Sequence, residues 1–526
     1  MSKILAMIKA FDRLTEKFTG LFVLLLIAVA LRVLSFFEPY WYGDEGIYLT
    51  IGHGLNQGKV LYRDIVDHKT PIIYYLAKVG SQLNFRILLT AWMLMSYSCF
   101  YFLTNKLVKN RKLSWLISLG FILITSLPLL EGLIPNGELF VMGFILLGLV
   151  ALSKTNYWQD FFQPAEIKKS SPLVKSVGWL LLSGIFMSLG ILTKVPAVFD
   201  AAAIFLIGWF NFFDHLALKE GLKQLNKKLW PTIGTFFLLA LAMAVPLVIS
   251  ASYFIFQGAG QDYLQYGLLY NFHYTSTWAP TIKTWLAPIW LPTLGKFMVA
   301  GGFIFFLTCL KKKVSPLIKW SAAWTVLALA ASTLSNRPYP HYLLQLVLPF
   351  TFLIAALFQA YLNRKQRLSS SLVFGFSLFL IVAVMQLISF WGYDSQKYYL
   401  NFWHYLTKKI SYQTYVQSFD PLVTNNNQAA QIIQKTPTQE IYIWGTNPML
   451  YAQTKTTPPD QFVVLFHVQD LNLVDQTVKK VMLAKPIYVV VMKNAVQPPV
   501  LFTNFIQNNY IPIGRFEHFI LWQLRK

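Results

Sequence analysis

The chain contains only two cysteines among its 526 residues, Cys99 and Cys309. Both lie in apolar stretches that we assign to different membrane spans, so no disulfide framework and no cysteine-based metal site can be built from them. Acidic residues are scarce as well, with 22 Asp and Glu, and charged residues make up 13% of the chain. Soluble globular proteins carry about 25% charged residues, so this composition excludes an ordinary soluble enzyme.

Hydrophobic residues make up 55% of the chain and aromatic residues 16%, which is typical of a multi-span membrane protein. The formal net charge of +23 would suggest nucleic-acid binding in a soluble protein. About half of the 45 Lys and Arg residues instead fall in six short segments between apolar runs: 1–20, 104–114, 153–176, 213–229, 309–319 and 362–370. These segments are alternate inter-span loops, so the charge follows the positive-inside rule and no nucleic-acid partner is expected.

Eleven segments are long and apolar enough to be membrane spans: about 20–38, 86–104, 114–130, 137–152, 177–195, 197–213, 230–253, 290–310, 317–335, 341–361 and 371–391. Since the basic loops are inside, the N-terminus is cytoplasmic, and an odd number of spans places residues after about 391 outside. The first span has no signal-peptide cleavage pattern and is expected to remain as an anchor. Apolar residues at helical spacing over 4–18 predict a short helix on the inner membrane surface.

The composition becomes that of a soluble domain after Trp391. Segments 441–444 and 487–492 are apolar runs typical of buried strands, and helical patterns cover 427–434 and 471–483. Strand, helix and strand in this order predict a small α/β domain with a right-handed crossover. It contains no glycine-rich phosphate loop, which argues against nucleotide binding. The predicted architecture is therefore an α-helical polytopic membrane domain, 1–391, followed by an extracytoplasmic α/β domain, 392–526.

Asp44 and Glu45 directly follow the first predicted span, at the outer membrane face. Charge beside lipid costs free energy unless it is used or compensated, which makes such a carboxylate pair a candidate functional site. In a cavity that restricts water, either residue could act as a general base toward an acceptor hydroxyl. The alternative is that Asp44 caps the N-terminus of a helix, because a helical stretch is predicted around 48–55.

The same outer loop carries a second group of polar residues, between Gly58 and a helical stretch that begins at Pro71. This group includes Tyr62, Asp67, His68 and Lys69. Its cationic side chains, with a histidine beside a carboxylate, can bind a phosphate through charge-assisted hydrogen bonds. The alternative is a solvated loop that contacts lipid headgroups.

Two cations stand at the outer ends of later spans. Lys194 ends an otherwise uncharged run, and Arg337 lies in a stretch that leads to His341. A lysine at a span end can also reach the headgroups without any further role. Two cations that converge on one outer vestibule nevertheless indicate an anionic ligand.

Glu131 and Glu138 flank an outer turn at Pro135 to Gly137. They could bind sugar hydroxyls or a divalent metal, or they could orient the lysines, and the supporting role is the simpler one. No cofactor is certain from the sequence, and no metal ligands are assigned. The outer segment at about 254–290 is rich in tyrosine, which suits either sugar binding or anchoring at the membrane interface.

Taken in order, these motifs resemble the polytopic lipid-phosphosugar glycosyltransferases of the C-type superfamily, which include protein mannosyltransferases and the lipid A aminoarabinose transferase. The matching pieces cover most of the chain: Asp44-Glu45, the Gly-x-x-x-Tyr-x-Asp run at 58–64, Asp67-His68-Lys69-Thr70-Pro71, Asn136-Gly137-Glu138, the span end at 189–194, the stretch 337–342 leading into Pro349, and 444–451. One departure is Thr70, where the family often has a second proline.

The resemblance implies transfer of a monosaccharide, with inversion, from a polyprenyl-phosphate donor to a hydroxyl of a lipid, glycan or protein acceptor at the outer face of the cell membrane. By the same resemblance, Asp44 is the catalytic carboxylate, His68 and Lys69 lie near the donor phosphate, and Lys194 and Arg337 hold the lipid-linked phosphate. The further candidates for substrate binding are Tyr62, Asp67, Glu131, Glu138 and His341.

Three alternatives follow from the same membrane architecture. A transporter or flippase for lipid-linked sugars would place charges in mid-span and show internal repeats, and neither is evident here. A membrane anchor for a binding domain would need only one span. An oligosaccharyltransferase that moves a glycan en bloc would depend on a divalent metal held by several carboxylates, so sensitivity to a chelator would distinguish it.

Overall fold

The computed structural model of the chain describes residues 19–162, 173–214, 222–276, 293–362 and 366–525, and most of these are helical. Every one of the eleven apolar segments predicted above overlaps a helix. These helices are Thr19–Phe37, which ends in η1 (Val33–Phe37), α4 (Gln82–Val108), α5 (Arg111–Ser126), α6 (Gly137–Leu152), α8 (Leu173–Ile191), α9 (Ala197–Asp214), α10 (Leu222–Phe256), α14 (Thr293–Cys309), α15 (Pro316–Ser332), α16 (Leu344–Leu362) and α17 (Arg367–Ile388). The surface helix predicted for 4–18 lies outside the described residues.

Six of the described helices are long and apolar enough to cross a membrane, or seven if α6 and α7 (Asn156–Phe162), which meet at 87°, form one bent span. Helices α5, α14 and α15 have 16, 17 and 17 residues. At about 1.5 Å per residue they reach roughly 25 Å, less than the ~30 Å hydrocarbon core. The polytopic helical class is thus confirmed, whereas fewer helices than the predicted eleven meet the criteria for a full span.

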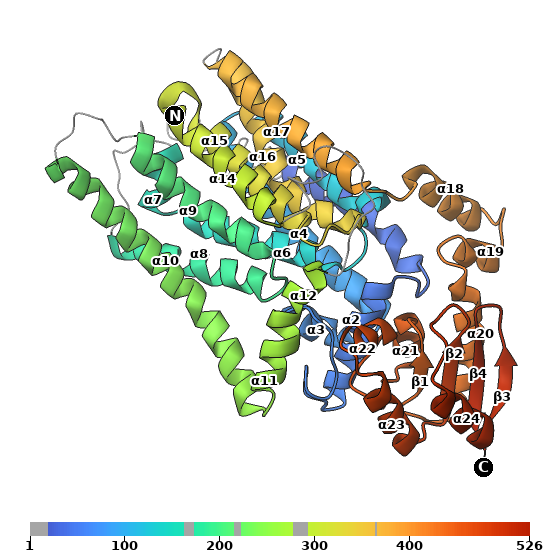
Figure 1. Cartoon of the computed structure of the whole chain (residues 1–526). Helices are drawn as coiled ribbons and strands as arrows, with labels where there is room; N and C mark the ends of the chain where they lie inside the picture. The colour runs from blue at the N-terminus through green and yellow to red at the C-terminus, as the bar shows by residue number, and fades with distance from the viewer. Residues whose placement is uncertain (1–18, 163–172, 215–221, 277–292, 363–365, 526) are drawn as a thin grey trace, which may run out of the picture.

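Burial separates the centre of the helix bundle from its outside. Nearly every residue of α15 is buried, because α15 packs against α9, α14, α16 and α17. Helix α10 lies at the edge of the bundle (Figure 1) and exposes large apolar side chains such as Phe237, Ile249 and Phe256. Lipid tails are as apolar as these side chains, so α10 presents a surface suited to the bilayer.

The segments between the bundle helices form short helices at the end of the bundle that holds the candidate site. The segment between η1 and α4, which is predicted to be the first outer segment and keeps that name below, contains α2 (Gly43–Asn56), α3 (Ile72–Leu76) and η2 (Ala77–Val79), in agreement with its two predicted helical stretches. The others are η3 (Pro128–Leu130), α11 (Gly260–Asp262), η5 (Tyr263–Leu269), α12 (Tyr270–Ser276) and η7 (Pro340–Leu343), while η6 (Lys311–Lys313) lies in a basic loop.

The C-terminal region combines helices with a mixed four-stranded sheet. Its elements are α18 (Ser395–Leu406), α19 (Tyr412–Gln417), α20 (Leu422–Ile433), β1 (Tyr442–Trp444), α21 (Pro448–Thr454), α22 (Leu465–Asp470), α23 (Val474–Ala484), β2 (Tyr488–Met492), α24 (Val500–Asn509), β3 (Tyr510–Arg515) and β4 (Phe519–Leu524). The strand order is β1-β2-β4-β3; β1 and β2 are parallel, and β4 is antiparallel to both neighbours.

The parallel pair β1 and β2 confirms the two strands predicted from the sequence, but β3 and β4 were not predicted. Strand β3 contains Pro512 and Gly514, two residues that usually interrupt strands. Here β3 lies at the sheet edge, and its register with β4 shifts between Pro512 and Gly514. An edge position with a bulge tolerates both residues, because the proline there need not donate to a neighbouring strand.

The C-terminal region packs on the first outer segment, beside α2 and α3 (Figure 1). Gly46 of α2 lies so close to α21 that a Cβ atom there would be 2.8 Å from the backbone nitrogen of Met449. The backbone N–H of Val66 donates to the carbonyl of Gln461 at 2.7 Å. One hydrophobic core runs through both parts, and the domain boundary after residue 391 stays a prediction.

Candidate active site

Glu45 belongs to a buried ion-pair cluster and not to the group around Asp44. The guanidinium of Arg86, on α4, donates to Glu45 Oε1 at 2.9 Å and to Oε2 at 2.7 Å. Another nitrogen of Arg86 lies 2.7 Å from Glu38 Oε2, and all three side chains are 1–2% exposed. The structure therefore places Glu45 against α4, away from the other residues predicted to form the site.

Asp44 lies in the first turn of α2, where the helix dipole favours a carboxylate. The cap position is occupied by Tyr42, so the alternative that Asp44 is the N-cap residue is wrong. Its Oδ2 accepts a hydrogen bond from the Tyr48 hydroxyl at 3.2 Å and lies 3.3 Å from Lys69 Nζ. With a side chain 29% exposed, Asp44 remains open to a bound molecule.

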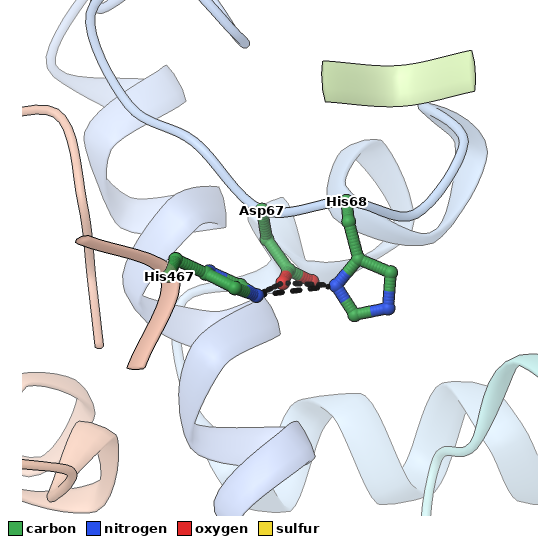
Figure 2. Close-up of side chains that lie close together, drawn as sticks. All are labelled: Asp67, His68 and His467. Carbon is green, nitrogen blue, oxygen red and sulfur yellow. Dashed lines mark hydrogen bonds and ion pairs between the residues drawn. The ribbon is translucent and has the colours of Figure 1, made fainter. Parts of the chain in front are cut away.

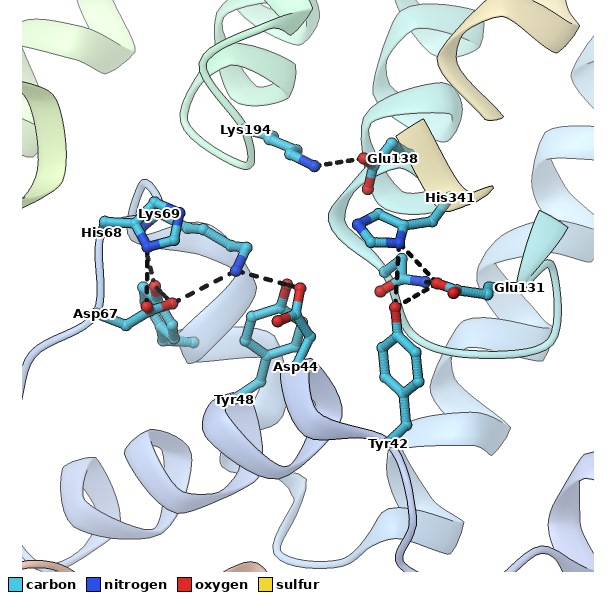
Figure 3. A network of polar contacts seen from close by, with 12 residues as sticks. Tyr42, Asp44, Tyr48, Asp67, His68, Lys69, Glu131, Glu138, Lys194 and His341 are labelled. Carbon is cyan, nitrogen blue, oxygen red and sulfur yellow. Dashed lines mark hydrogen bonds and ion pairs between the residues drawn. The ribbon is translucent and has the colours of Figure 1, made fainter. Parts of the chain in front are cut away.

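Lys69 connects two carboxylates, Asp44 and Asp67 (Figure 3). Its ammonium lies 3.3 Å from Asp44 Oδ2 and 3.6 Å from Asp67 Oδ2. Burial alone would lower the pKa of Lys69, but the two carboxylates raise it well above its usual value. In the same way, burial would raise the pKa of Asp67, but Lys69 and His68 bring it well below the usual range. All three groups are therefore charged at neutral pH.

Two tyrosines hold the loop that presents Lys69. The Tyr62 hydroxyl donates to the carbonyl of Lys69 at 2.8 Å, and Tyr62 itself has a left-handed backbone, with φ of 71°. The Tyr74 hydroxyl donates to Asp67 Oδ2 at 2.6 Å and accepts from the backbone N–H of Lys69 at 3.0 Å. Tyr62, predicted to bind substrate, is fully buried and positions the loop instead of facing the cavity.

Glu131 and His341 form a second polar group with Tyr42 (Figure 3). The Nδ1 atom of His341 lies 2.6 Å from Glu131 Oε2, and the Tyr42 hydroxyl donates to the same carboxylate oxygen. Tyr42 precedes Asp44 by two residues, so this group is joined through the backbone to the start of α2. The structure thus brings Glu131 and His341 together beside Asp44.

Lys194 and Arg337 each lie on an aromatic ring. Lys194 forms an ion pair with Glu138, and its ammonium is 4.5 Å from the centre of the Tyr342 ring. The guanidinium of Arg337 is 3.9 Å from the centre of the Tyr274 ring. Both tyrosines line the cavity described next, so the two cations approach it from α8 and α15, as their span-end positions predicted.

A cavity of about 320 Å³ joins a polar end to an apolar extension. His68, Lys69, Glu138 and Lys194 line its polar end. The apolar part runs between the bundle helices and the segment of α12, and its walls include Val195, Pro196, Val198, Phe199, Leu268, Phe272, Phe297 and Leu334. This shape suits an amphiphile that has an anionic head and a hydrocarbon tail.

His467 of α22 extends the cluster toward the C-terminal region. Its Nε2 lies 3.4 Å from Asp67 Oδ1, and His68 Nδ1 lies 3.1 Å from the same oxygen (Figure 2). Burial lowers the pKa of His467 to about 3 and also lowers the pKa of His68, although Asp67 opposes both shifts. Both rings are therefore neutral at physiological pH, and these three residues can hold a metal ion.

His467 and the three tyrosines at positions 42, 48 and 74 were not predicted from the sequence to belong to the site. No spacing pattern links His467 to Asp67, because 400 residues separate them in the chain. The tyrosines lie in or beside helices that were predicted, but their hydroxyl contacts follow only from the packing of α2 on α3. The sequence offered one local signal for these contacts: in a helix, Asp44 lies one turn before Tyr48, so their side chains can meet.

No family model matches the chain, and comparison with curated proteins finds no match. Among solved structures, ArnT from Cupriavidus metallidurans bound to undecaprenyl phosphate matches with a TM-score of 0.54 and 12% identity, over 95% of this chain and 97% of ArnT. Its apo form matches with a TM-score of 0.54 and 13% identity, over 96% and 98%. The oligosaccharyltransferase AglB from Archaeoglobus fulgidus, in complex with an inhibitory peptide and a dolichol-phosphate, has a TM-score of 0.40, 12% identity and coverage of 90% and 69%.

The match to ArnT extends over nearly the whole of both chains, including the C-terminal region. It confirms the predicted fold, a polytopic helical bundle with a small mixed α/β region after it, and the resemblance to ArnT that it shows is one of fold.

Proposed function

We propose that this chain is a membrane glycosyltransferase that moves a monosaccharide from a polyprenyl-phosphate donor to a hydroxyl acceptor, with inversion. The observation that supports it most strongly is the cavity of about 320 Å³, whose polar end holds Lys69 and Lys194 and whose other walls are mostly apolar. A polyprenyl phosphate has the same two parts. The fold shared with ArnT, a structure of which contains undecaprenyl phosphate, points in the same direction.

In the donor-binding step, the phosphate takes a place between Lys69 and Lys194. Each lysine contacts a carboxylate in the described structure, Asp44 or Asp67 for the first and Glu138 for the second. A phosphate has more acceptor oxygens and more negative charge than a single carboxylate. It can therefore bind both lysines while each lysine keeps its carboxylate partner. The prenyl chain then follows the apolar walls toward Phe199 and Phe297.

In the transfer step, the acceptor oxygen forms a bond to the anomeric carbon while the bond from that carbon to the phosphate oxygen breaks. The phosphate leaves with the bonding electron pair, and the lysines stabilise its growing charge. The acceptor proton passes to the carboxylate of Asp44, which has the exposure that a base requires. No residue of the chain becomes covalently linked to the sugar, so one displacement inverts the configuration.

Donor binding would also tune Asp44 as a base. Burial alone would raise the pKa of the Asp44 carboxyl, but the charges of Lys69 and His341 outweigh burial. Without donor, the pKa of Asp44 therefore lies below its usual value. A base works best when its pKa is near the working pH. A phosphate beside Lys69 would offset the lysine charge and raise the pKa of Asp44, so the base gains strength when the donor is in place.

The acceptor would bind in a second cavity, of about 290 Å³, which Glu131 lines. Aromatic rings and polar side chains line it together, including Trp41, Tyr393, Tyr398 and Asn401. Aromatic faces and carboxylates suit the alternating apolar and hydroxyl surfaces of a sugar. Because Trp41 is three residues from Asp44, an acceptor held there can present its hydroxyl to the base. Both cavities would open at the outer membrane face, as the basic loops predict.

The direct test is donor binding and transfer by the full chain in nanodiscs. We expect the wild-type protein to bind undecaprenyl phosphate in native mass spectrometry and Lys69→Ala to bind it at least tenfold more weakly. Lys78→Ala is the matched control, because Lys78 is an exposed lysine on the neighbouring η2. Equal binding by both variants, or no binding by the wild type, would refute the proposed donor site.

A further inference from the structure

We propose that Lys296 of α14 is a positioning residue of the donor site, because its ammonium fixes the turn that presents Arg337 to the cavity. Lys296 is 1% exposed and lies in the first turn of α14, at the end of the helix that borders the cavity. A buried cation within a membrane domain costs free energy, so its presence indicates a function. The inference rests on the donor binding proposed above, because the position of Arg337 matters for function only if an anionic group binds there.

The ammonium of Lys296 contacts neutral acceptors. Its Nζ donates to Asn336 Oδ1 at 2.7 Å and to the backbone carbonyl of Thr333. Among the residues that the structure describes, no Asp or Glu lies within ion-pair distance of this ammonium. Lys69 and Lys194, in contrast, each contact a carboxylate. The contacts of Lys296 therefore hold a segment of backbone and do not form an ion pair.

Both acceptors belong to the turn that joins α15 to η7. Thr333 is the C-cap residue of α15, where a cation is favourable because the last carbonyls of a helix lack partners within it. Asn336 has a left-handed backbone, with φ of 55°, which is uncommon for a residue other than glycine. One ammonium thus holds both the residue that ends the helix and the residue that turns the chain.

The same turn forms part of the wall of the donor cavity. Three residues in or beside it line the cavity: Ser332, Leu334 and Ser335. Phe297, the residue after Lys296 on α14, lines the cavity as well. Lys296 itself is not part of the lining, so it acts through the turn and does not touch a molecule in the cavity.

Arg337 comes directly after this turn. Its guanidinium lies 3.9 Å from the centre of the Tyr274 ring, and that ring stacks on the His68 imidazole, with the ring centres 4.5 Å apart. Tyr274 and His68 both line the cavity. The backbone at Asn336 sets the direction in which Arg337 leaves the turn. Without the ammonium of Lys296, Asn336 loses a contact that holds this backbone, and the guanidinium can move away from the ring.

Donor binding by the full chain in nanodiscs tests the role, with undecaprenyl phosphate and its uncharged counterpart undecaprenol as ligands. We expect Lys296→Met to weaken binding of undecaprenyl phosphate about tenfold, the scale of a cation–aromatic contact, and to leave binding of undecaprenol nearly unchanged. Arg337→Ala should have at least as large an effect. The double variant should bind no more weakly than Arg337→Ala alone, because Lys296 acts through Arg337. Lys319→Met is the matched control, because Lys319 is a buried lysine at the other end of α15.

The preference for the phosphate over the alcohol separates positioning from a role in folding. If Lys296 only caps α15, Lys296→Met melts earlier but keeps this preference, and the positioning role is overturned. Should Lys296→Met not fold, Asn336→Ala removes the acceptor of the same contact and should show the same loss of preference.

Two results distinguish failure of this role from failure of the donor site. The positioning role alone is overturned if Lys69→Ala loses donor affinity while Lys296→Met binds undecaprenyl phosphate as tightly as the wild type. It is also overturned if the losses in Lys296→Met and Arg337→Ala multiply in the double variant. Equal binding by the wild type and Lys69→Ala would overturn the donor site itself, and the role of Lys296 with it.

Discussion

Two ion-pair clusters each include one carboxylate of α2 and have the same composition, one cation between two carboxylates, but they differ in access to solvent. Arg86 lies between Glu38 and Glu45, and all three side chains are 1–2% exposed. Lys69 lies between Asp44 and Asp67, and the Asp44 side chain is 29% exposed.

Arginine presents several fixed donors and can satisfy two carboxylates at once, which suits a permanent contact. The lysine ammonium is a compact charge on a flexible chain, which suits a contact that changes when a ligand arrives. Asp44 and Glu45 are neighbours in the sequence but point to different clusters. The difference in exposure supports the roles proposed above, a structural one for the first cluster and a catalytic one for the second.

Removing the cation of the closed cluster should have the largest effect on stability. Arg86→Met leaves Glu38 and Glu45 buried without their partner, and breaking a buried ion pair in this way costs about 3–5 kcal/mol. We expect a strong loss in the free energy of unfolding, measured by thermal or denaturant unfolding in detergent. Arg367→Met is the control, because Arg367 is an exposed arginine at the start of α17. Equal losses for both variants would remove the structural role assigned to Arg86.

Removing a cation of the open site should act mainly on the reaction. Lys194→Ala takes away a charge that would meet the phosphate in the ground state and more strongly in the transition state. We expect the single-turnover transfer rate to fall about 10²–10³-fold and donor affinity to weaken, while most of the protein remains folded. The transfer rate of Lys194→Ala is divided by that of the control Lys78→Ala to give the effect of the lost charge. A loss of folding without a loss of rate in the folded fraction would contradict this assignment.

The smallest effect should come from changing geometry at constant charge. Arg337→Lys keeps a cation but loses the planar group that stacks 3.9 Å from the centre of the Tyr274 ring. Cation–aromatic contacts are worth about 0.5–2 kcal/mol, so donor affinity should fall by roughly twofold to 30-fold. Titration with undecaprenyl phosphate in nanodiscs measures it. If Arg337→Lys binds donor as tightly as the wild type, the stacked geometry has no part in donor binding.

The residues of the open cluster were easier to select from the sequence than the contacts of the closed one, for a physical reason. Charges at the ends of apolar runs are conspicuous, so Lys69, Lys194 and Arg337 could be assigned to one membrane face before any contact was known. The contact of Glu45 with Arg86 could not be predicted, because it depends on how α2 packs on α4. Two adjacent carboxylates look alike in a sequence, and only packing distinguishes them.

Long-range contacts set a similar limit in the rest of the chain. The parallel strands β1 and β2 were predicted from their apolar runs, while β3 was missed because its edge position is what permits Pro512. The position of His467 beside Asp67 results from the docking of α22 on the first outer segment. Sequence spacing contains no information about that docking.

The central claim is that Asp44 is the base and Glu45 only supports the structure, and one paired measurement tests it. Asp44→Asn and Glu45→Gln change adjacent residues in the same chemical way. We measure the single-turnover transfer rate and the melting temperature of each variant in nanodiscs loaded with donor. Asp44→Asn should lose about 10²–10⁴-fold in rate with little change in melting temperature. Glu45→Gln should melt earlier but transfer at nearly the wild-type rate while folded. Wild-type transfer by folded Asp44→Asn would contradict the account.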